Sequence, residues 1–594
     1  MNNKSKQPSK FFATLIHSVG SPVVNELPFF LVTACFFCLK STLHSLPAVF
    51  GNPHLDYSLL VAQRCFVGLF FSYAFAAVAH VVSNRIAKNM VYASMFIIML
   101  IDFFLQANTH TGIGAEALRL VAETYTSEAT EFLQDYLLSS ASMKAYAKVA
   151  IYLAAFISLT VIRNKWGHNM LQRVAAPVNW LTLATLLTSV GFGECFVVLA
   201  QLSTTEQMMS YCEYYNFPDP VSRIIAATKT LYVSGKETQQ AINANIAIKP
   251  PTPRQSNDSI NIVVVIGESF IKWHSPLYGY PLNTTPHMAS EAACNNLITF
   301  NNAYSPASQT SLAIKNILSC NSVSNDEKWF DHPIFPTLFK QSNWNVYLWD
   351  NQRGYGQGSM WTFALNSFLY DKELNPIAFT ENNPDCYAHD GELIDSFNFD
   401  VSSGGNLVIF HLNGQHHNAS ERFPHEKRFM RFTCDSINRN EQWLDRSKKT
   451  AIAQYDNATL YNDYILSQIY NKFKDSNSIV IYFSDHGEEI YDYRDNRGRK
   501  LDGDITPTLC RYIFEVPFFV WYSHGYKTKY PHKVQALLNA QDKTFSTDEL
   551  CHILFNLANL PTEHYKPERD IMHNDYKERI PVAYFGEKKH KIVK

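Results

Sequence analysis

The sequence lacks three features that would point to common classes of protein. Lysine and arginine number 51 against 53 aspartates and glutamates, a net charge of −2, so no excess of positive charge attracts a nucleic-acid partner. No internal repeat or low-complexity tract is present, which excludes a repeat array. No small-residue cleavage site follows the first apolar run, which is therefore predicted to remain as a membrane anchor.

Long apolar runs are also absent after Gln201, whereas they dominate the residues before it. Their length predicts a bundle of five transmembrane helices within residues 1–200. The alternative is a soluble protein with five buried core helices. The five segments are residues 27–46, 59–82, 90–107, 145–162 and 178–200.

Basic residues gather in alternate connections between these segments. Because Lys and Arg near membrane ends stay on the cytoplasmic side, these connections are predicted to be cytoplasmic, and the acidic connection 108–144 to be exported. An odd number of spans then places everything after Gln201 outside the cytoplasm. The alternation of basic and non-basic connections also disfavours the soluble alternative. The basic residues are Lys4, Lys6 and Lys10, then Arg85 and Lys88, then Arg163, Lys165 and Arg173.

The exported part begins with a predicted connection over residues 201–258, which ends in the Pro-containing linker 249–259. A domain is predicted over residues 259–594. There, amphipathic helical stretches alternate with the short apolar runs NIVVVI, NLITF, WNVYLW, NLVIFHL, SIVIYF and VPFFVWY. This alternation predicts an α/β domain with a largely parallel sheet covered on both faces.

Seven of the eleven cysteines fall in the exported part, where disulfides can form. An odd number leaves at least one of them unpaired, and the pairing cannot be deduced from the sequence. The seven are Cys212, Cys294, Cys320, Cys386, Cys434, Cys510 and Cys551.

Two of the apolar runs end in residue types that bind metals. NIVVVI leads into Gly-Glu268-Ser, and SIVIYF leads into Ser-Asp485-His486-Gly. Open α/β sheets place their ligands at the carboxyl ends of such strands. Two carboxylates and an imidazole suit Zn²⁺, and Mn²⁺ also accepts them. An ordinary turn explains each motif taken alone, but their coincidence favours a metal site.

A hydroxyl nucleophile is predicted in the stretch AYSPASQTSLAIKNILSC. Thr310 begins an amphipathic helix there, where helix amides attract a phosphate and a neighbouring metal lowers the pKa of a hydroxyl. The alternative is that Ser308, Thr310 or Ser311 caps the helix. His416, in a Gly-x-His motif, is predicted to bind a phosphate oxygen or to protonate a leaving group. His411 is predicted to be a satisfied histidine within its strand.

These stretches together resemble the membrane-anchored phosphoethanolamine transferases, a family that includes the lipid A modifying enzymes responsible for polymyxin resistance. The motifs occur in the family's order and, with the five-span anchor, cover nearly the full chain. The resemblance implies an alkaline phosphatase or sulfatase-like fold, and a bacterial inner membrane location with the catalytic domain in the periplasm. The motifs are VVVIGES, HSPLYGYPLNTTP, SQTSLAIKNILS, NVYLWDNQ, HDGELID, GQHHNASERFP, YDNATLYNDYILSQI, FSDHGEE and FEVPFFVW.

The resemblance also implies the chemistry of the site. One tightly bound zinc, with manganese as the alternative, would be held by Glu268, Thr310, Asp485 and His486. Thr310 would be the nucleophile that takes phosphoethanolamine from phosphatidylethanolamine, releases diacylglycerol, and passes the group to lipid A or another lipopolysaccharide or glycan acceptor. His416 matches the family's histidine near the phosphoryl group.

Further partners and binding residues follow from the same resemblance. Thr124 and Glu128 lie four apart in the exported connection 108–144, and they match positions thought to receive the ethanolamine headgroup. Donor, acceptor and membrane lipids are the expected partners, and a monomer is expected.

The chain departs from the family in two places. Many members carry a further His-Gly pair after FSDHGEE, but no histidine occurs in YDYRDNRGRKLDGDITPTLCRYIFEVPF, so a second metal site is in doubt. Family cysteines often bracket the nucleophile turn; here Cys320 follows Thr310 and Cys294 precedes it at a distance, which leaves a disulfide at this helix open. Candidates for the missing positive charge are Arg494, Arg497, Arg499, Lys500 and Arg511.

Two other functions compete with this interpretation. One is a glycerolphosphate transferase of the lipoteichoic acid synthase type, which uses phosphatidylglycerol and often manganese; Gln309-Thr310 and the YDNATLYNDYILSQI stretch favour the ethanolamine branch. The other is a catalytically silent membrane-anchored binding module, which the presence of every predicted ligand disfavours. The sequence does not specify the acceptor.

Overall fold

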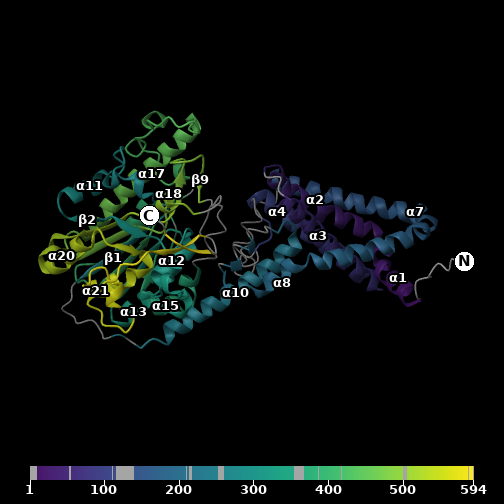
Figure 1. Ribbon diagram of the computed structural model, residues 1–594, viewed down its shortest axis with the longest axis horizontal. Coiled ribbons are helices and arrows are strands. Elements are labelled where there is room, and N and C mark those ends of the chain that lie inside the picture. The colour runs from purple at the N-terminus through teal and green to yellow at the C-terminus, as the bar shows by residue number, and fades with distance from the viewer. Residues whose placement is uncertain are drawn as a thin grey trace, which may run out of the picture. The chain divides into compact units, whose positions relative to one another are not determined.

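The computed structural model divides the chain into two compact units, Met1–Gly235 and Lys236–Lys594 (Figure 1). Each unit is described by itself. The residues that the structure describes are 10–51, 55–109, 112–114, 140–205, 207–208, 211–212, 217–249, 251, 260–352, 367–385, 387–416, 418–499, 505–585 and 588–592.

The first unit is helical and apolar. Four of its described segments are long and apolar enough to cross a membrane: Ser58–Val81, Arg85–Ala107, Ala141–Lys165 and Pro177–Gln201. A fifth arises if Thr14–Asn25 and Leu27–Leu43, bent by 82°, form one span, and the number is then the predicted five. The helices are α1 (Lys10–Asn25), α2 (Leu27–Gly51), α3 (Leu55–Val81), α4 (Arg85–Thr109), α7 (Ser140–Gly191), α8 (Glu194–Gln201) and α10 (Pro220–Ile246), which continues into the second unit.

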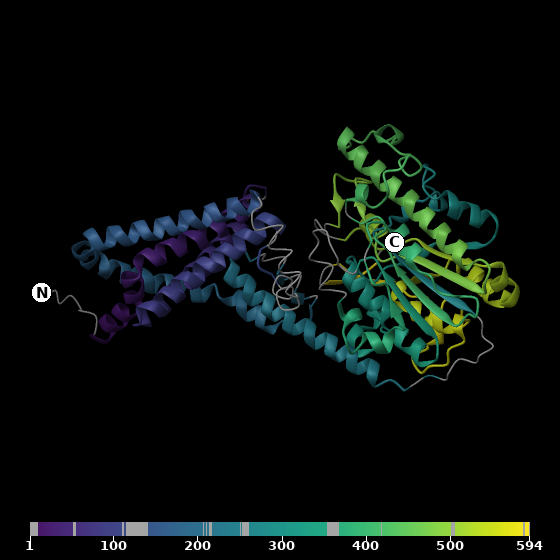
Figure 2. The same ribbon diagram turned by 180° about the vertical axis from the view of Figure 1, so that it is seen from behind.

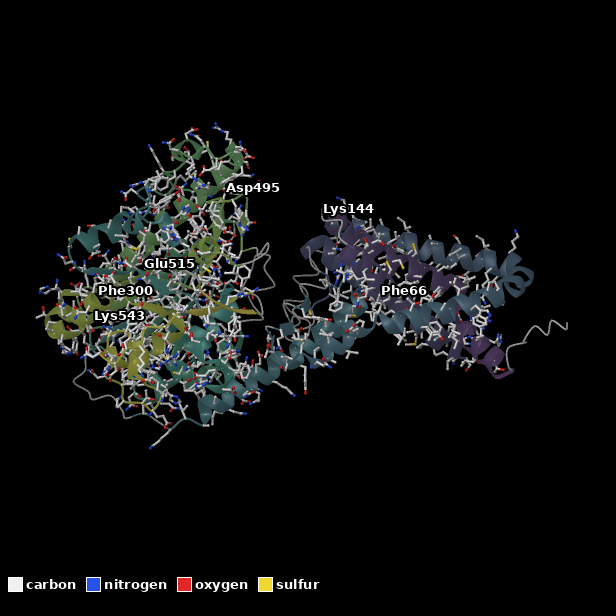
Figure 3. All side chains as sticks on the ribbon, in the orientation of Figure 1. Phe66, Lys144, Phe300, Asp495, Glu515 and Lys543 are labelled. Carbon is white, nitrogen blue, oxygen red and sulfur yellow. The ribbon has the colours of Figure 1, made fainter. Side chains whose placement is uncertain are left out.

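Side chains of this unit are distributed as a lipid environment requires. Ile151 and Val190 are 69% and 70% exposed, which suits lipid-facing positions. Aromatic rings fill the interior, and Phe66, labelled in Figure 3, stacks on Phe192 at 5.5 Å. Because lipid tails are as apolar as these side chains, such close packing is what holds the helices together.

A seven-stranded mixed sheet forms the centre of the second unit, in the order β2-β10-β7-β1-β6-β4-β5. The four pairings among β7, β1, β6, β4 and β5 are parallel, whereas β10 runs antiparallel to both β7 and β2. All six predicted runs are strands of this sheet, and β5 is an addition. The strands are β1 (Asn261–Gly267), β2 (Leu297–Phe300), β4 (Asn345–Asp350), β5 (Glu381–Asn382), β6 (Asn406–His411), β7 (Ser478–Ser484) and β10 (Phe518–Tyr522).

Helices cover both faces of the sheet (Figures 1 and 2). Ile262, Val264 and Ile266 of β1 pack with the core side chains of α12 (Thr310–Leu318), α13 (Phe335–Gln341) and α21 (Leu550–Ala558). Val263 and Val265 pack on the other face with α11 (Pro286–Ala293), α16 (Asp390–Ser396) and α17 (Arg446–Phe473). Burial of each such side chain contributes about 1.5–3 kcal/mol, which explains why the central strand is apolar on both sides.

The antiparallel edge is closed by aromatic packing. Phe300 of β2, labelled in Figure 3, lies 5.2 Å from the ring of Phe518 and 5.9 Å from that of Phe545. These edge-to-face contacts stabilise the antiparallel pairing of β2 with β10. The carboxyl ends of the parallel strands lie at a common edge of the sheet.

One buried histidine joins three segments of this unit. His274, from the HSPLYGYP stretch, places Nδ1 2.7 Å from Asp456 Oδ1 and Nε2 3.0 Å from Asp492 Oδ1. Tyr280 stacks on the imidazole at 4.5 Å and donates to Asp456 Oδ2. Burial alone would lower the pKa of His274, but the two carboxylates raise it to about 9. The imidazolium therefore holds α17 and the segment around Asp492 together.

We expect this clamp to make stability depend on pH. Because the pKa of His274 rises from 6.5 to about 9 on folding, its stabilisation is complete below pH 6.5 and is lost as pH rises through 9, with a magnitude on the order of 3 kcal/mol. The melting temperature of full-length protein in detergent should fall over this window, and His274→Gln should abolish the fall. His524→Gln, at an exposed histidine, is the control. An equal fall in His274→Gln contradicts the prediction.

Candidate active site

The register of two neighbouring strands brings the predicted ligands together. β1 pairs in parallel with β7, and Gly267 lies opposite Ser484, so Glu268 and Asp485 leave the sheet side by side. Gly267 is required because a Cβ there would lie 2.2 Å from the Tyr482 hydroxyl. The apolar strand β1 therefore ends in a glycine, Gly267, next to the Tyr482 side chain, and the carboxylate of Glu268 follows directly.

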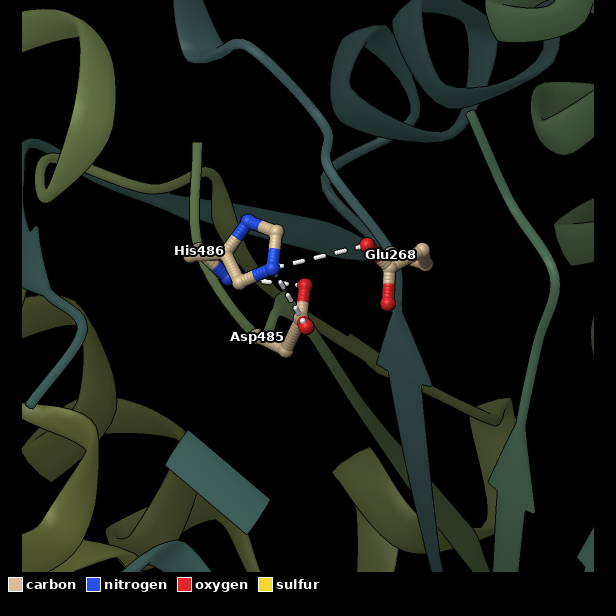
Figure 4. A group of neighbouring side chains, drawn as sticks. All are labelled: Glu268, Asp485 and His486. Atoms are coloured by element: carbon tan, nitrogen blue, oxygen red, sulfur yellow. Dashed lines mark hydrogen bonds and ion pairs between the residues drawn. The ribbon is translucent and has the colours of Figure 1, made fainter. Parts of the chain in front are cut away.

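Glu268, Asp485 and His486 form a compact buried group (Figure 4). Their candidate ligand atoms lie within 4.8 Å of one another, and each residue is 0% exposed. His486 Nε2 lies 3.1 Å from Asp485 Oδ2 and 3.5 Å from Glu268 Oε1. Asp485 Oδ2 forms no hydrogen bond with any residue that the structure describes. An unsatisfied buried carboxylate oxygen is costly, and a cation at this point would satisfy it.

The hydroxyl of Thr310 completes the group. Thr310 is the first residue of α12, and its Oγ1 donates to Glu268 Oε2 at 3.0 Å and lies 3.0 Å from His486 Nε2. The N-cap of this helix is Gln309, whose side chain makes no capping hydrogen bond. The hydroxyl thus contacts the metal-ligand candidates at a helix N-terminus, where amides attract anions.

The electrostatics of the group favour a divalent cation. Burial raises the pKa of Asp485 well above its usual range, and the charge of Glu268 adds to this. Burial alone would also raise the pKa of Glu268. The interactions of this carboxyl with His486, His416 and Arg499 are stronger than the effect of burial, and they lower its pKa. Burial also lowers the pKa of His486 to about 3, so its imidazole is neutral, as metal ligation requires. Two carboxylates, a neutral imidazole and a hydroxyl fit one zinc-type ion.

Two residues that the sequence did not single out support Glu268. Ser269, at a left-handed φ of 56°, donates from Oγ to Glu268 Oε1 at 2.6 Å. Gln352 donates from Nε2 to Glu268 Oε2 at 3.0 Å and to the Leu412 carbonyl at 2.7 Å. Ser269 lies in the motif VVVIGES and Gln352 in the motif NVYLWDNQ, both of which carry the family resemblance. Membership in these motifs was the only sequence feature that could have indicated a role for the two residues.

Arg499 supplies positive charge beside the site. Its guanidinium NH1 lies 3.1 Å from Ser269 Oγ, 3.1 Å from His486 Nδ1 and 3.2 Å from Glu488 Oε2. The other candidates are occupied or placed elsewhere. Arg494 pairs with Glu489, Arg511 lies 3.6 Å from the ring centroid of Trp273, Arg497 is exposed, and Lys500 falls outside the described residues.

The remaining predicted residues have mixed outcomes. His416 is half-buried, and burial lowers its pKa while the charge of Glu268 opposes this, which places it in electrostatic reach of the group. His411 lies in β6 with Nδ1 2.9 Å from Asp350 Oδ1, but its buried Nε2 has no hydrogen-bond partner among the described residues, so the prediction of a satisfied histidine holds for one ring nitrogen only. Thr124 and Glu128 lie outside the described residues.

Comparison with known proteins decides the family. Residues 260–560, half of the chain, match the family described as Sulfatase. The chain belongs to the sulfatase family. It is 24% identical over 478 residues to "Phosphoethanolamine transferase EptC" of Escherichia coli O18:K1:H7, and the match covers 78% of each chain. The predicted resemblance to membrane phosphoethanolamine transferases is thereby confirmed.

One solved structure similar to this sulfatase-family chain agrees with it in fold over nearly its whole length. The integral membrane protein lipooligosaccharide phosphoethanolamine transferase A (EptA) from Neisseria meningitidis matches with a TM-score of 0.53 and 17% identity, over 94% of this chain and 98% of that chain. The predicted fold, apolar helices followed by a sulfatase-like domain, is confirmed. The C-terminal periplasmic domain of EptC from Escherichia coli, in complex with Zn, has a TM-score of 0.48 at 24% identity and covers 58% of this chain and 96% of that chain.

A glycine behind Glu268 offers a test of the metal group. Gly414 has a φ of +46°, and a Cβ there would lie 2.9 Å from both the amide nitrogen and the carbonyl oxygen of Glu268. If Glu268 is a metal ligand, Gly414→Ala should displace it and weaken the binding of added zinc by about 10- to 100-fold, measured as metal content after dialysis against graded chelator.

Gly279→Ala is the matched control for this variant. Gly279 also has a left-handed φ, +96°, but a Cβ there would meet nothing within 4 Å. Both variants carry the backbone cost of about 1–2 kcal/mol, and only Gly414→Ala carries the collision with Glu268. Equal metal content in the two variants contradicts the assignment of Glu268 as a ligand.

Proposed function

We propose that this protein transfers phosphoethanolamine from phosphatidylethanolamine to an outer-surface glycolipid, such as lipid A or another lipopolysaccharide. The observation that carries the proposal is the Thr310 hydroxyl at a helix N-terminus, 3.0 Å from both Glu268 Oε2 and His486 Nε2. The names of its relatives support the same transferred group. We further propose a monomer in the bacterial inner membrane, with an anchor at residues 1–200, a connection at 201–258 and a periplasmic catalytic domain at 259–594.

Thr310 acts as the nucleophile in the proposed reaction. A bond forms from Thr310 Oγ1 to the donor phosphorus as the bond from phosphorus to the diacylglycerol oxygen breaks. The hydroxyl proton leaves on the Glu268 side, to which it is already hydrogen-bonded. The leaving oxygen takes a proton, for which His416 is the proposed donor. A phosphoethanolamine-threonine intermediate remains. An acceptor oxygen then attacks its phosphorus and gives its proton to His416, which lost one in the first step, while the bond from phosphorus to Thr310 Oγ1 breaks and Oγ1 takes back the proton from the Glu268 side.

Zinc is the proposed metal, with manganese as the alternative, and Glu268, Thr310, Asp485 and His486 would hold it. When bound, such an ion lowers the pKa of a hydroxyl ligand and neutralises phosphoryl charge. The imidazole favours zinc or manganese over magnesium or calcium, which prefer oxygen ligands alone. Gln352 and Ser269 orient Glu268 by hydrogen bonds, so the carboxylate is positioned before substrate arrives.

Two further groups of this chain support a phosphoryl substrate. The first turn of α12 presents backbone amides around Thr310, and these favour an anion. Arg499 adds a fixed positive charge next to Ser269 and His486. Negative charge develops on the transferred phosphoryl oxygens in the transition state. Donors that are already in place at that position stabilise this charge effectively. Thr124 and Glu128 are proposed to receive the ethanolamine amine.

Loss of the Thr310 hydroxyl should abolish the reaction. Full-length protein in detergent, given headgroup-labelled phosphatidylethanolamine, should release diacylglycerol and gain a phosphoethanolamine adduct in its intact mass. Both should vanish in Thr310→Ala, whereas Thr310→Ser keeps a hydroxyl and should retain part of each. Turnover of labelled phosphatidylglycerol instead contradicts the donor. Turnover of neither lipid, with zinc or manganese supplied, contradicts the enzyme and favours a binding module.

Removal of the Arg499 charge should slow transfer without loss of metal. Arg499→Ala should lower kcat about 10- to 100-fold, since one electrostatic donor near the phosphoryl group is removed, and Arg499→Lys should recover part of the loss. Arg497→Ala, two residues away and exposed, is the control. Steady-state transfer rates and zinc content are the measurements. An Arg499→Ala enzyme with the rate of the control contradicts a role for this guanidinium.

A further inference from the structure

Two cysteines far apart in the sequence meet in the core beneath the nucleophile helix. Cys320 lies two residues beyond α12, and Cys551 lies in the first turn of α21. Both are buried, at 5% and 0% exposure, and belong to the same apolar cluster. Both are free thiols in this structure, and burial, together with the neighbouring Cys551 thiol, raises the pKa of Cys320. A disulfide requires two cysteines on segments that lie side by side.

The segments around the two cysteines are tied side by side by other contacts. Asp548 Oδ2 accepts a hydrogen bond from the amide of Val323 at 2.9 Å. Arg569 donates to the carbonyl of Asn321 at 2.6 Å and pairs with Glu549 at 3.5 Å. The residues next to Cys320 therefore contact the residues next to Cys551 through independent groups, which hold the two cysteine-bearing segments side by side.

We propose that Cys320 and Cys551 form a disulfide that fixes the C-terminal end of the Thr310 helix to α21. The pairing differs from one between Cys320 and Cys294, because Cys294 is exposed at the end of α11, whereas Cys551 is buried in the same apolar cluster as Cys320. The proposal rests on the exported location of the domain and not on the transfer reaction.

Formation of the bond is a thiol–disulfide exchange. Cys320 and Cys551 each lose the hydrogen of their thiol, one sulfur–sulfur bond forms, and the disulfide of an oxidant protein of the exported compartment is reduced to two thiols. Because both sulfurs are buried in the finished core, the exchange takes place while the domain folds. Once closed, the bond is shielded from reductants, and it acts as a structural link that holds α12, and with it Thr310, in place.

Peptide mapping tests the bond directly. Full-length protein is purified in detergent without reductant, denatured with an alkylating reagent, digested and analysed by mass spectrometry. A peptide pair joined through Cys320 and Cys551 is expected, while the partly exposed Cys434 and the buried Cys510 carry the alkyl label. Alkylation of both Cys320 and Cys551, or a link from either to another cysteine, overturns the proposal. The readout needs no activity, so failure of the proposed transferase function leaves it intact.

Thermal stability tests the consequence. A bond between Cys320 and Cys551 closes a long loop of the chain and should raise the melting temperature by about 5–10 °C. Strong reductant during denaturation should lower the melting temperature of the native protein and of Cys434→Ser by this amount. Reductant should leave the melting temperature of the double variant, Cys320→Ser with Cys551→Ser, unchanged. An equal effect of reductant on the double variant contradicts the stabilising role, and if that variant does not fold, the native protein with and without reductant gives the same comparison.

Discussion

The site depends on one unfavourable pair of charges, the carboxylates of Glu268 and Asp485 at the ends of adjacent parallel strands. Both are fully buried, and burial together with the charge of Glu268 raises the pKa of Asp485 well above its usual range. Two like charges in a low dielectric cannot both persist unless a cation lies between them. The surrounding residues prepare for such a cation: Ser269 and Gln352 hold Glu268, and Asp485 Oδ2 is left without a hydrogen bond from any described residue.

The position of Thr310 follows from the same arrangement and from the packing of α12. Almost every residue of that helix is buried, and its apolar side chains pack on the face of the sheet formed by Ile262, Val264 and Ile266. The helix therefore cannot rotate without a large loss of buried area. Its N-terminus is held toward Glu268 and His486, which makes the hydroxyl geometry a property of the core more than of a surface loop.

The sequence predicted those parts of the molecule that local pattern determines. β-branched runs identified six of the seven strands, and strand ends identified Glu268, Asp485 and His486, because parallel neighbours place such residues together. The support of Glu268 by Gln352 was not predictable, since it spans 84 positions and depends on sheet order. The antiparallel direction of β10 and the bend of 82° between α1 and α2 were missed for the same reason: no short pattern encodes them.

A covalent intermediate suits the substrates of the proposed reaction. The proposed donor and acceptor are both lipids whose tails would stay in a membrane, and a direct transfer between them would require both bulky headgroups at one site at once. In the proposed reaction, attachment of the group to Thr310 would let diacylglycerol leave before the acceptor arrives, so that one site would serve two substrates in turn. The nucleophile must then hold the same geometry in both half-reactions. A nucleophile with that requirement is best placed on a packed helix, and Thr310 begins such a helix, with its oxygen 3.0 Å from both Glu268 Oε2 and His486 Nε2.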